Sequence, residues 1–243
     1  MWVWLHKFAS PPHCYRLART TRAVVRLERI RADRGCTLWR AGARTPDYQQ
    51  GDAFRIIYVH APSAWMSLCV YVVMALASAI GLIWRIKLAH AVAASCAPIG
   101  ASFAFCSAGH GCPVGSADVG HLVGVGRTPD FGLILLFLYL GYIALRASID
   151  DLQRADRASA VLALVGVVNV PIIHYSVVWW NTLHQPATVT KMAAPSISTS
   201  MLIPLLMMIV GFTLCFVALL LVRVRGEVLR RERSAGWIRE AMA

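Results

Sequence analysis

Five long apolar stretches restrict what this chain can fold into. They cover residues 63–84, 89–107, 131–145, 159–180 and 201–222, and the first and last contain no charged residue. A helix needs ~20 apolar residues to cross the ~30 Å hydrocarbon core of a bilayer. A large soluble helical protein would show polar faces at helical spacing, which these stretches lack. The sequence therefore predicts an all-α, polytopic helical membrane protein with five apparent spans, the third of them short, in a single integral membrane domain over 1–243.

The basic residues near the ends of the spans indicate their orientation. They gather in three places, between the first and second spans, between the third and fourth, and after the last: Arg85 and Lys87; Arg146, Arg154 and Arg157; Arg223, Arg225, Arg230, Arg231 and Arg233. If the spans alternate in direction, all three places lie on one side, which the positive-inside bias makes cytoplasmic. We therefore expect a basic cytoplasmic tail at 223–243 and a periplasmic loop at 108–130. The N-terminus has no secretory apolar region, so we expect no cleaved signal.

Two histidines lie at the outer ends of two separate spans. His60 lies in YVHAPSAW, just before 63–84, and His184 lies in HYSVVWWNTLHQP, just after 159–180. Imidazole is a common metal ligand, and paired histidines are a standard way to hold haem iron. Trp179 and Trp180 fit either an aromatic belt at the membrane surface or stacking on a porphyrin. The pattern predicts a haem site at the membrane surface, with His60 and His184 as metal ligands and the two tryptophans beside the cofactor.

Other polar residues have simpler interpretations. His174 lies ten residues before His184, and its neighbours Pro171 and Tyr175 favour a helix kink or a hydrogen-bonding role. Seven scattered cysteines without a CxxC pair argue against a full disulfide framework, and those in the spans are expected to be small packing residues. Three acids mix with arginines in a cytoplasmic turn and are expected to form a solvated linker: Asp150, Asp151 and Asp156.

Two segments do not fit this plan. Residues 16–44 contain nine arginines and two acids, and residues 107–131 form a glycine-rich loop. The simple interpretation of 16–44 is a basic arm on an anionic membrane or on nucleic acid. The alternative is a shift of reading frame in both segments, which changes most arginine codons into codons for small or apolar residues. In that frame Asp118–Arg127 is compatible with MWGTWWVWD. We interpret both segments as frameshifted, so that they conceal an apolar span and a tryptophan-rich loop.

Four motifs carry a resemblance to a known family. They are PDYQQGDAFRIIYVHAPSAW (46–65), CAPIGASFAF (96–105), LILLFLYLGYIAL (133–145) and GVVNVPIIHYSVVWWNTLHQ (166–185). Together they closely resemble the CcmC family, haem-handling membrane proteins of the cytochrome c maturation system. The resemblance implies six spans, both termini in the cytoplasm, and a tryptophan-rich periplasmic loop, the WWD domain, between the third and fourth spans. The first span and this loop are missing as written, and both fall where the frame looks shifted.

The resemblance also implies the site and its partners. His60 and His184 match, by their flanking motifs, the two periplasmic histidines that are axial ligands to haem b in the family. Such proteins work in the bacterial inner membrane, pass haem to the haem chaperone CcmE, act with CcmA, CcmB and CcmD, and are not enzymes. Two alternatives stay open, namely a membrane haem or quinone oxidoreductase subunit and a frameshifted, inactive remnant of the family. We expect membrane lipid, but no nucleic acid, as a further partner.

The shifted frame is a prediction about the DNA. We expect the alternative frame to be open through codons 16–44 and 107–131, and to encode an apolar span in the first segment and several tryptophans in the second. Sequencing the DNA of both regions checks this. Stop codons that interrupt the alternative frame would exclude a frameshift and leave a genuine arginine-rich arm.

Overall fold

The bundle is all-helical in the part of the chain that the structure describes. The computed structural model describes Pro11, Tyr15 and residues 57–111, 131–179 and 198–237. Six helices follow one another in these residues: α4 (Ile57–Trp84), α5 (Lys87–Gly111), α6 (Phe131–Ala147), α7 (Leu152–Gly166), α8 (Asn169–Trp179) and α9 (Thr199–Arg231). Four segments are long and apolar enough to cross a membrane, namely 57–84, 87–108, 152–175 and 201–231. A further helix, 132–147, is apolar but shorter. The prediction of a polytopic helical membrane protein is confirmed.

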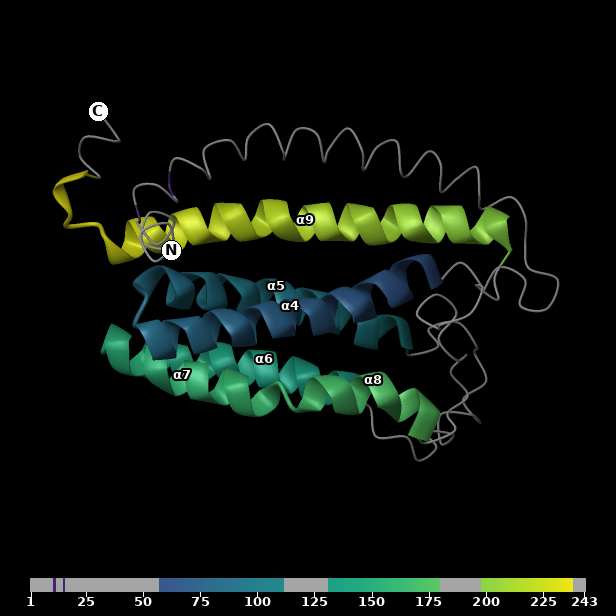
Figure 1. Ribbon diagram of the computed structural model, residues 1–243, viewed down its shortest axis with the longest axis horizontal. Helices are drawn as coiled ribbons and strands as arrows, with labels where there is room; N and C mark the ends of the chain where they lie inside the picture. Colours follow the sequence, from purple (N-terminus) through teal and green to yellow (C-terminus); the bar gives the residue numbers. More distant parts are fainter. Residues whose placement is uncertain (1–10, 12–14, 16–56, 112–130, 180–197, 238–243) are drawn as a thin grey trace.

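The helices pack in three layers, with α4 and α5 in the middle layer. Figure 1 shows α9 along one side of this pair, with α6, α7 and α8 on the other side, and the closest packing is between α4 and α5 themselves. Large apolar side chains remain exposed on the outside, among them Phe105, Phe137 and Val165. In a bilayer such side chains face lipid rather than water, so their exposure is expected.

Tyr139 of α6 lies at the centre of the packed core. Its side chain is fully buried, its ring meets the ring of Tyr71 edge-on with centroids 5.0 Å apart, and its hydroxyl donates to the Ser67 carbonyl oxygen at 2.8 Å. A Cβ added at Gly100 of α5 would lie 2.1 Å from Tyr139 Cζ. Small residues allow helices in membranes to approach closely, and here the glycine makes room for a whole ring.

The fourth span is not one straight helix. The sequence predicted a span at 159–180, but α7 begins at Leu152 and ends at Gly166, and two residues then separate it from α8. Pro171 explains the break, because it has no N–H to donate back to the carbonyl of Val167. That carbonyl instead accepts the amide of Val170 at 3.0 Å. Proline is tolerated in the first turn of the new helix, where α8 begins.

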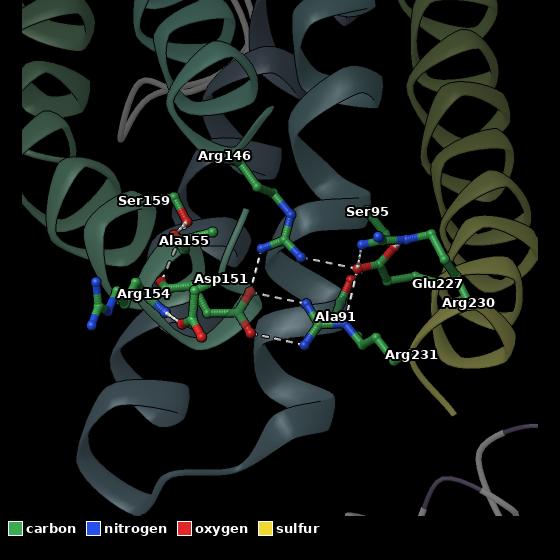
Figure 2. A network of polar contacts seen from close by, with 11 residues as sticks. Ala91, Ser95, Arg146, Asp151, Arg154, Ala155, Ser159, Glu227, Arg230 and Arg231 are labelled. Atoms are coloured by element: carbon green, nitrogen blue, oxygen red, sulfur yellow. Dashed lines mark hydrogen bonds and ion pairs between the residues drawn. The ribbon is translucent and has the colours of Figure 1, made fainter. Parts of the chain in front are cut away.

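An ion-pair network joins three helices at one end of the bundle. Arg231 of α9 donates to both carboxylate oxygens of Asp156 of α7, at 2.8 and 3.0 Å, and its Nε donates to Glu227 at 2.8 Å. Arg146, at the end of α6, pairs with Asp156 and reaches Glu227 at 3.0 Å (Figure 2). Asp156 is only 6% exposed. The prediction that it belongs to a solvated linker is therefore wrong, because its charge is buried between two arginines.

Asp151 has a defined role as well. Its side chain accepts the amide of Arg154 at 2.7 Å and so caps the N-terminus of α7. An aspartate here satisfies one of the amides that a helix start leaves without a partner, and its charge suits the positive end of the helix dipole. The sequence expectation took it only as a solvated linker residue.

The helix ends give the bundle two distinct ends. The α4–α5 turn, the α6–α7 turn and the C-terminal part of α9 lie together, and we refer to this as the basic end. Figure 1 shows the start of α4, the end of α8 and the start of α9 at the opposite end, the His60 end. The three basic connections therefore do gather on one side. The predicted tail at 223–243 begins inside α9, which continues to Arg231.

Tyr15 packs against the C-terminal part of α9 and against Trp237. Its ring lies 4.5 Å from the guanidinium carbon of Arg225, its hydroxyl accepts from Arg225 Nη2 at 2.8 Å, and Trp237 meets it edge-on. Tyr15 therefore lies at the basic end, whereas Ile57 begins α4 at the His60 end. The interpretation of 16–44 itself falls outside the described residues.

The contact between Gly100 and Tyr139 predicts a sharp effect of one added methyl group. Gly100→Ala forces Tyr139 to move and should destabilise the protein by about 1–3 kcal/mol, the usual cost of overpacking a core. Gly211→Ala is the matched control, because an added Cβ there meets no atom within 4 Å. Thermal unfolding in detergent or nanodiscs measures both variants. Equal unfolding midpoints for the two would contradict the packing described here.

The ion-pair network predicts that Asp156 and Asp151 differ in how much they contribute to stability. Asp156→Asn removes the shared negative charge and leaves Arg146 and Arg231 short of a partner in a buried site, so we expect a loss of about 3–5 kcal/mol. Asp151→Asn is the control, because asparagine is an equally good N-cap. The same unfolding measurement distinguishes them. If Asp156→Asn unfolds like the control, the network does not stabilise the packing of α6, α7 and α9.

Candidate functional site

The candidate site begins at the contact between α4 and α5 at the His60 end. The sequence placed His60 just before its span, but α4 begins at Ile57, so His60 lies in the first turn of the helix. Its side chain is half-buried, and its Nδ1 lies 3.1 Å from the carbonyl oxygen of Ser107, near the end of α5. Two long antiparallel helices therefore meet at this imidazole.

The Ser107 contact bears on the protonation of the His60 ring. A carbonyl oxygen only accepts hydrogen bonds, so Nδ1 can make a hydrogen bond to it only as the protonated nitrogen. In the neutral ring the lone pair then lies on Nε2, and a nitrogen lone pair is what imidazole offers to a metal. A His60 ring in that tautomer would offer Nε2 to a metal ion.

The sequence around His60 explains why the helix holds it in place. The neighbouring Tyr58 is buried, which anchors the first turn of α4 against the bundle. Ser63 is fully buried, and its hydroxyl donates to the Val59 carbonyl at 2.6 Å, so that this hydroxyl is satisfied within its own helix. His60 therefore projects from an ordered turn.

An apolar groove of about 340 Å³ lies beside the same turn of α5. It is lined by α5 and α6 through Ala101, Ser102, Phe105, Cys106, Leu136 and Leu140. Phe105 is 67% exposed, so the groove opens on the outer surface of the bundle. Cys106 precedes Ser107, so an apolar surface begins one residue from the carbonyl that holds His60.

The other predicted site residues can be placed only in part. Trp179 is the last residue of α8, and its backbone lies at the His60 end, but its side chain is outside the described residues. Trp180 and His184 follow it and also fall outside them. The bis-histidine site with its two tryptophans therefore stays a prediction. Within the described ranges, no three His, Cys, Asp or Glu side chains gather closely enough to hold a metal ion.

His174 lies elsewhere in the fold. It is exposed on α8, and its ring meets the ring of Tyr175 edge-on at 5.0 Å. Pro171 does mark a break in the span, as its position suggested, but the break lies on the N-terminal side of the proline.

Ser107 is the site residue that the sequence did not reveal. Its side chain has no special chemistry, and the group that contacts His60 is its backbone carbonyl. A backbone carbonyl is present at every residue, so no motif could single it out. The contact arises only because α4 and α5 pack antiparallel with their ends in register.

Comparison with known proteins identifies the family. Residues 4–239 match the family described as CcmC, heme exporter protein C. The chain belongs to the CcmC family.

Several curated relatives carry the name "Heme exporter protein C". The relative from Haemophilus influenzae is 40% identical over 98% of this chain and 97% of its own length, and the relative from Escherichia coli K12 is 40% identical over 99% and 97%. The relative from Bradyrhizobium diazoefficiens is 46% identical over 80% of this chain and 74% of its own. The CcmC match therefore runs through both 16–44 and 107–131, and the resemblance drawn from four motifs is confirmed for the chain as a whole.

Proposed function

We propose that this membrane protein binds haem b at the periplasmic face of the bacterial inner membrane and delivers it for cytochrome c maturation. Two observations support the proposal: membership of the CcmC family, and the half-buried His60 at the end of the bundle opposite the basic connections. The family name describes export of haem, which supports a haem-handling role rather than an enzymatic one.

In the proposed site, His60 and His184 would hold the haem iron through their ring nitrogens. Bound haem supplies an iron centre that accepts two such ligands. The indoles of Trp179 and Trp180 cover part of the flat ring, since aromatic faces stack on apolar macrocycles. His60 comes from α4, and His184 follows α8 in the chain, so the two ligands belong to opposite halves of the sequence.

Delivery requires that these ligands can be exchanged. Neutral imidazole is a ligand for which protons compete, so binding weakens as pH falls through the histidine range. The proposed acceptor is the haem chaperone CcmE, and the proposed companions are CcmA, CcmB and CcmD. The positive-inside bias supports the orientation, because the basic end then lies in the cytoplasm and His60 in the periplasm.

The proposed ligand role of His60 and His184 gives a direct test. His60→Ala and His184→Ala should each lower haem affinity by more than the ~10–100-fold that loss of a mere outer-shell partner causes, because a direct ligand is removed. The measurement is the Soret absorbance of purified full-length protein titrated with haem. His174→Ala is the control, since this histidine is exposed on α8 and should leave the spectrum unchanged.

Two results would refute the proposal. One is an unchanged haem spectrum in either His60→Ala or His184→Ala. The other is labelling from outside the cell that finds cysteines introduced at these two positions on different faces of the membrane, because one haem could not then reach both.

A further inference from the structure

The His60–Ser107 contact joins a side chain of one helix to the backbone of another at the candidate site. We propose that the carbonyl of Ser107 is a positioning group that fixes His60 as the Nδ1–H tautomer and so presents Nε2 to haem iron. This inference rests on the proposed function, because it concerns how one of the proposed ligands is prepared. It adds a residue on α5 to a site whose predicted members all come from α4 and from the segment around the end of α8.

The physical argument begins with the chemistry of the ring. Neutral imidazole carries its proton on either nitrogen, and the hydrogen bond made by one nitrogen decides which of them is available to a metal. The 3.1 Å distance from Nδ1 to the Ser107 oxygen is within the range of an N–H···O hydrogen bond. Metal-ligating histidines commonly donate their other N–H to such a carbonyl, which fixes the ring orientation and raises the basicity of the ligand.

The chemistry of the Ser107 carbonyl suits this contact. Ser107 lies near the C-terminal end of α5, which ends at Gly111. A carbonyl oxygen has two lone pairs, so it can accept the Nδ1–H of His60 in addition to a helical amide. A serine or threonine hydroxyl here could act as donor or acceptor, whereas a carbonyl accepts only and therefore selects one tautomer.

The rival interpretation is that the hydrogen bond only fastens α4 to α5. It would then stabilise the bundle without affecting which nitrogen meets the iron. The two interpretations differ in the tautomer of the haem-free protein and in the response of haem affinity to a local change in α5, so both can be measured separately from folding.

The first measurement uses haem-free protein. Full-length protein labelled with ¹⁵N-histidine in nanodiscs, at a pH about two units above the ordinary histidine pKa of ~6.5, reports the protonated nitrogen of each ring by NMR. The signals of His60 are those lost in His60→Ala. We expect its Nδ1 to carry the proton and its Nε2 to be unprotonated. An unprotonated Nδ1 would overturn the proposal.

The second measurement moves the carbonyl without changing either side chain. Ala108→Pro disfavours helical backbone at the preceding residue, Ser107, and so redirects its carbonyl. We expect His60 to show a mixture of tautomers and haem affinity to fall ~10–100-fold, the usual effect of losing an outer-shell partner. Gly109→Pro is the matched control, because its restriction falls on Ala108 and leaves Ser107 helical. Ala108→Val controls for side-chain size.

The outcomes separate this inference from the proposed function. If Ala108→Pro unfolds like Gly109→Pro and keeps both the tautomer and the haem affinity of the unsubstituted protein, the carbonyl does not position His60. If His60→Ala binds haem normally, the proposed function fails whatever the tautomer. If His60→Ala loses haem while NMR shows Nδ1 unprotonated, the function stands and only the positioning role of Ser107 is overturned.

Discussion

The ion-pair network at the basic end holds together helices that otherwise share little surface. α9 packs chiefly against α4 and α5, and α6 and α7 lie on the far side of that pair. Arg146, Asp156, Glu227 and Arg231 connect these two sides through paired hydrogen bonds with little exposure to solvent. Charges in such a place are stable only as a set, because removing one leaves its partners buried and unpaired. The network therefore sets the relative positions of α6, α7 and α9.

The His60 end is organised by backbone geometry rather than by charge. The break between α7 and α8 redirects the chain that leads towards His184, and the end of α5 meets the first turn of α4. The break leaves Asn169 Nδ2 and the hydroxyl of Tyr71 buried, with no hydrogen-bond partner among the described residues. Irregular backbone at membrane depth is tolerated only where protein or a cavity surrounds it.

Some of the fold was predictable and some was not, for physical reasons that differ between residues. Apolar stretches are an intrinsic property of the chain, so the spans, including the short third one, appear at nearly the predicted places. The start of α4 lies six residues before the predicted span, and in this first part His60 contacts the Ser107 carbonyl of α5. Asp156 was misjudged, because its partners Arg146 and Arg231 lie 10 and 75 residues away and nothing local marks them.

The sequence by itself determined the membrane class, the side on which the basic connections gather, the family, and the two histidines proposed as ligands. These follow from composition and short motifs, because lipid forces apolar segments into helices wherever those segments occur. Only the tertiary structure decided which carbonyl contacts His60, which glycine leaves room for the Tyr139 ring and which carboxylate pairs with Arg146 and Arg231. Each of these depends on the register of helices far apart in the chain, and such register exists only once the bundle has packed.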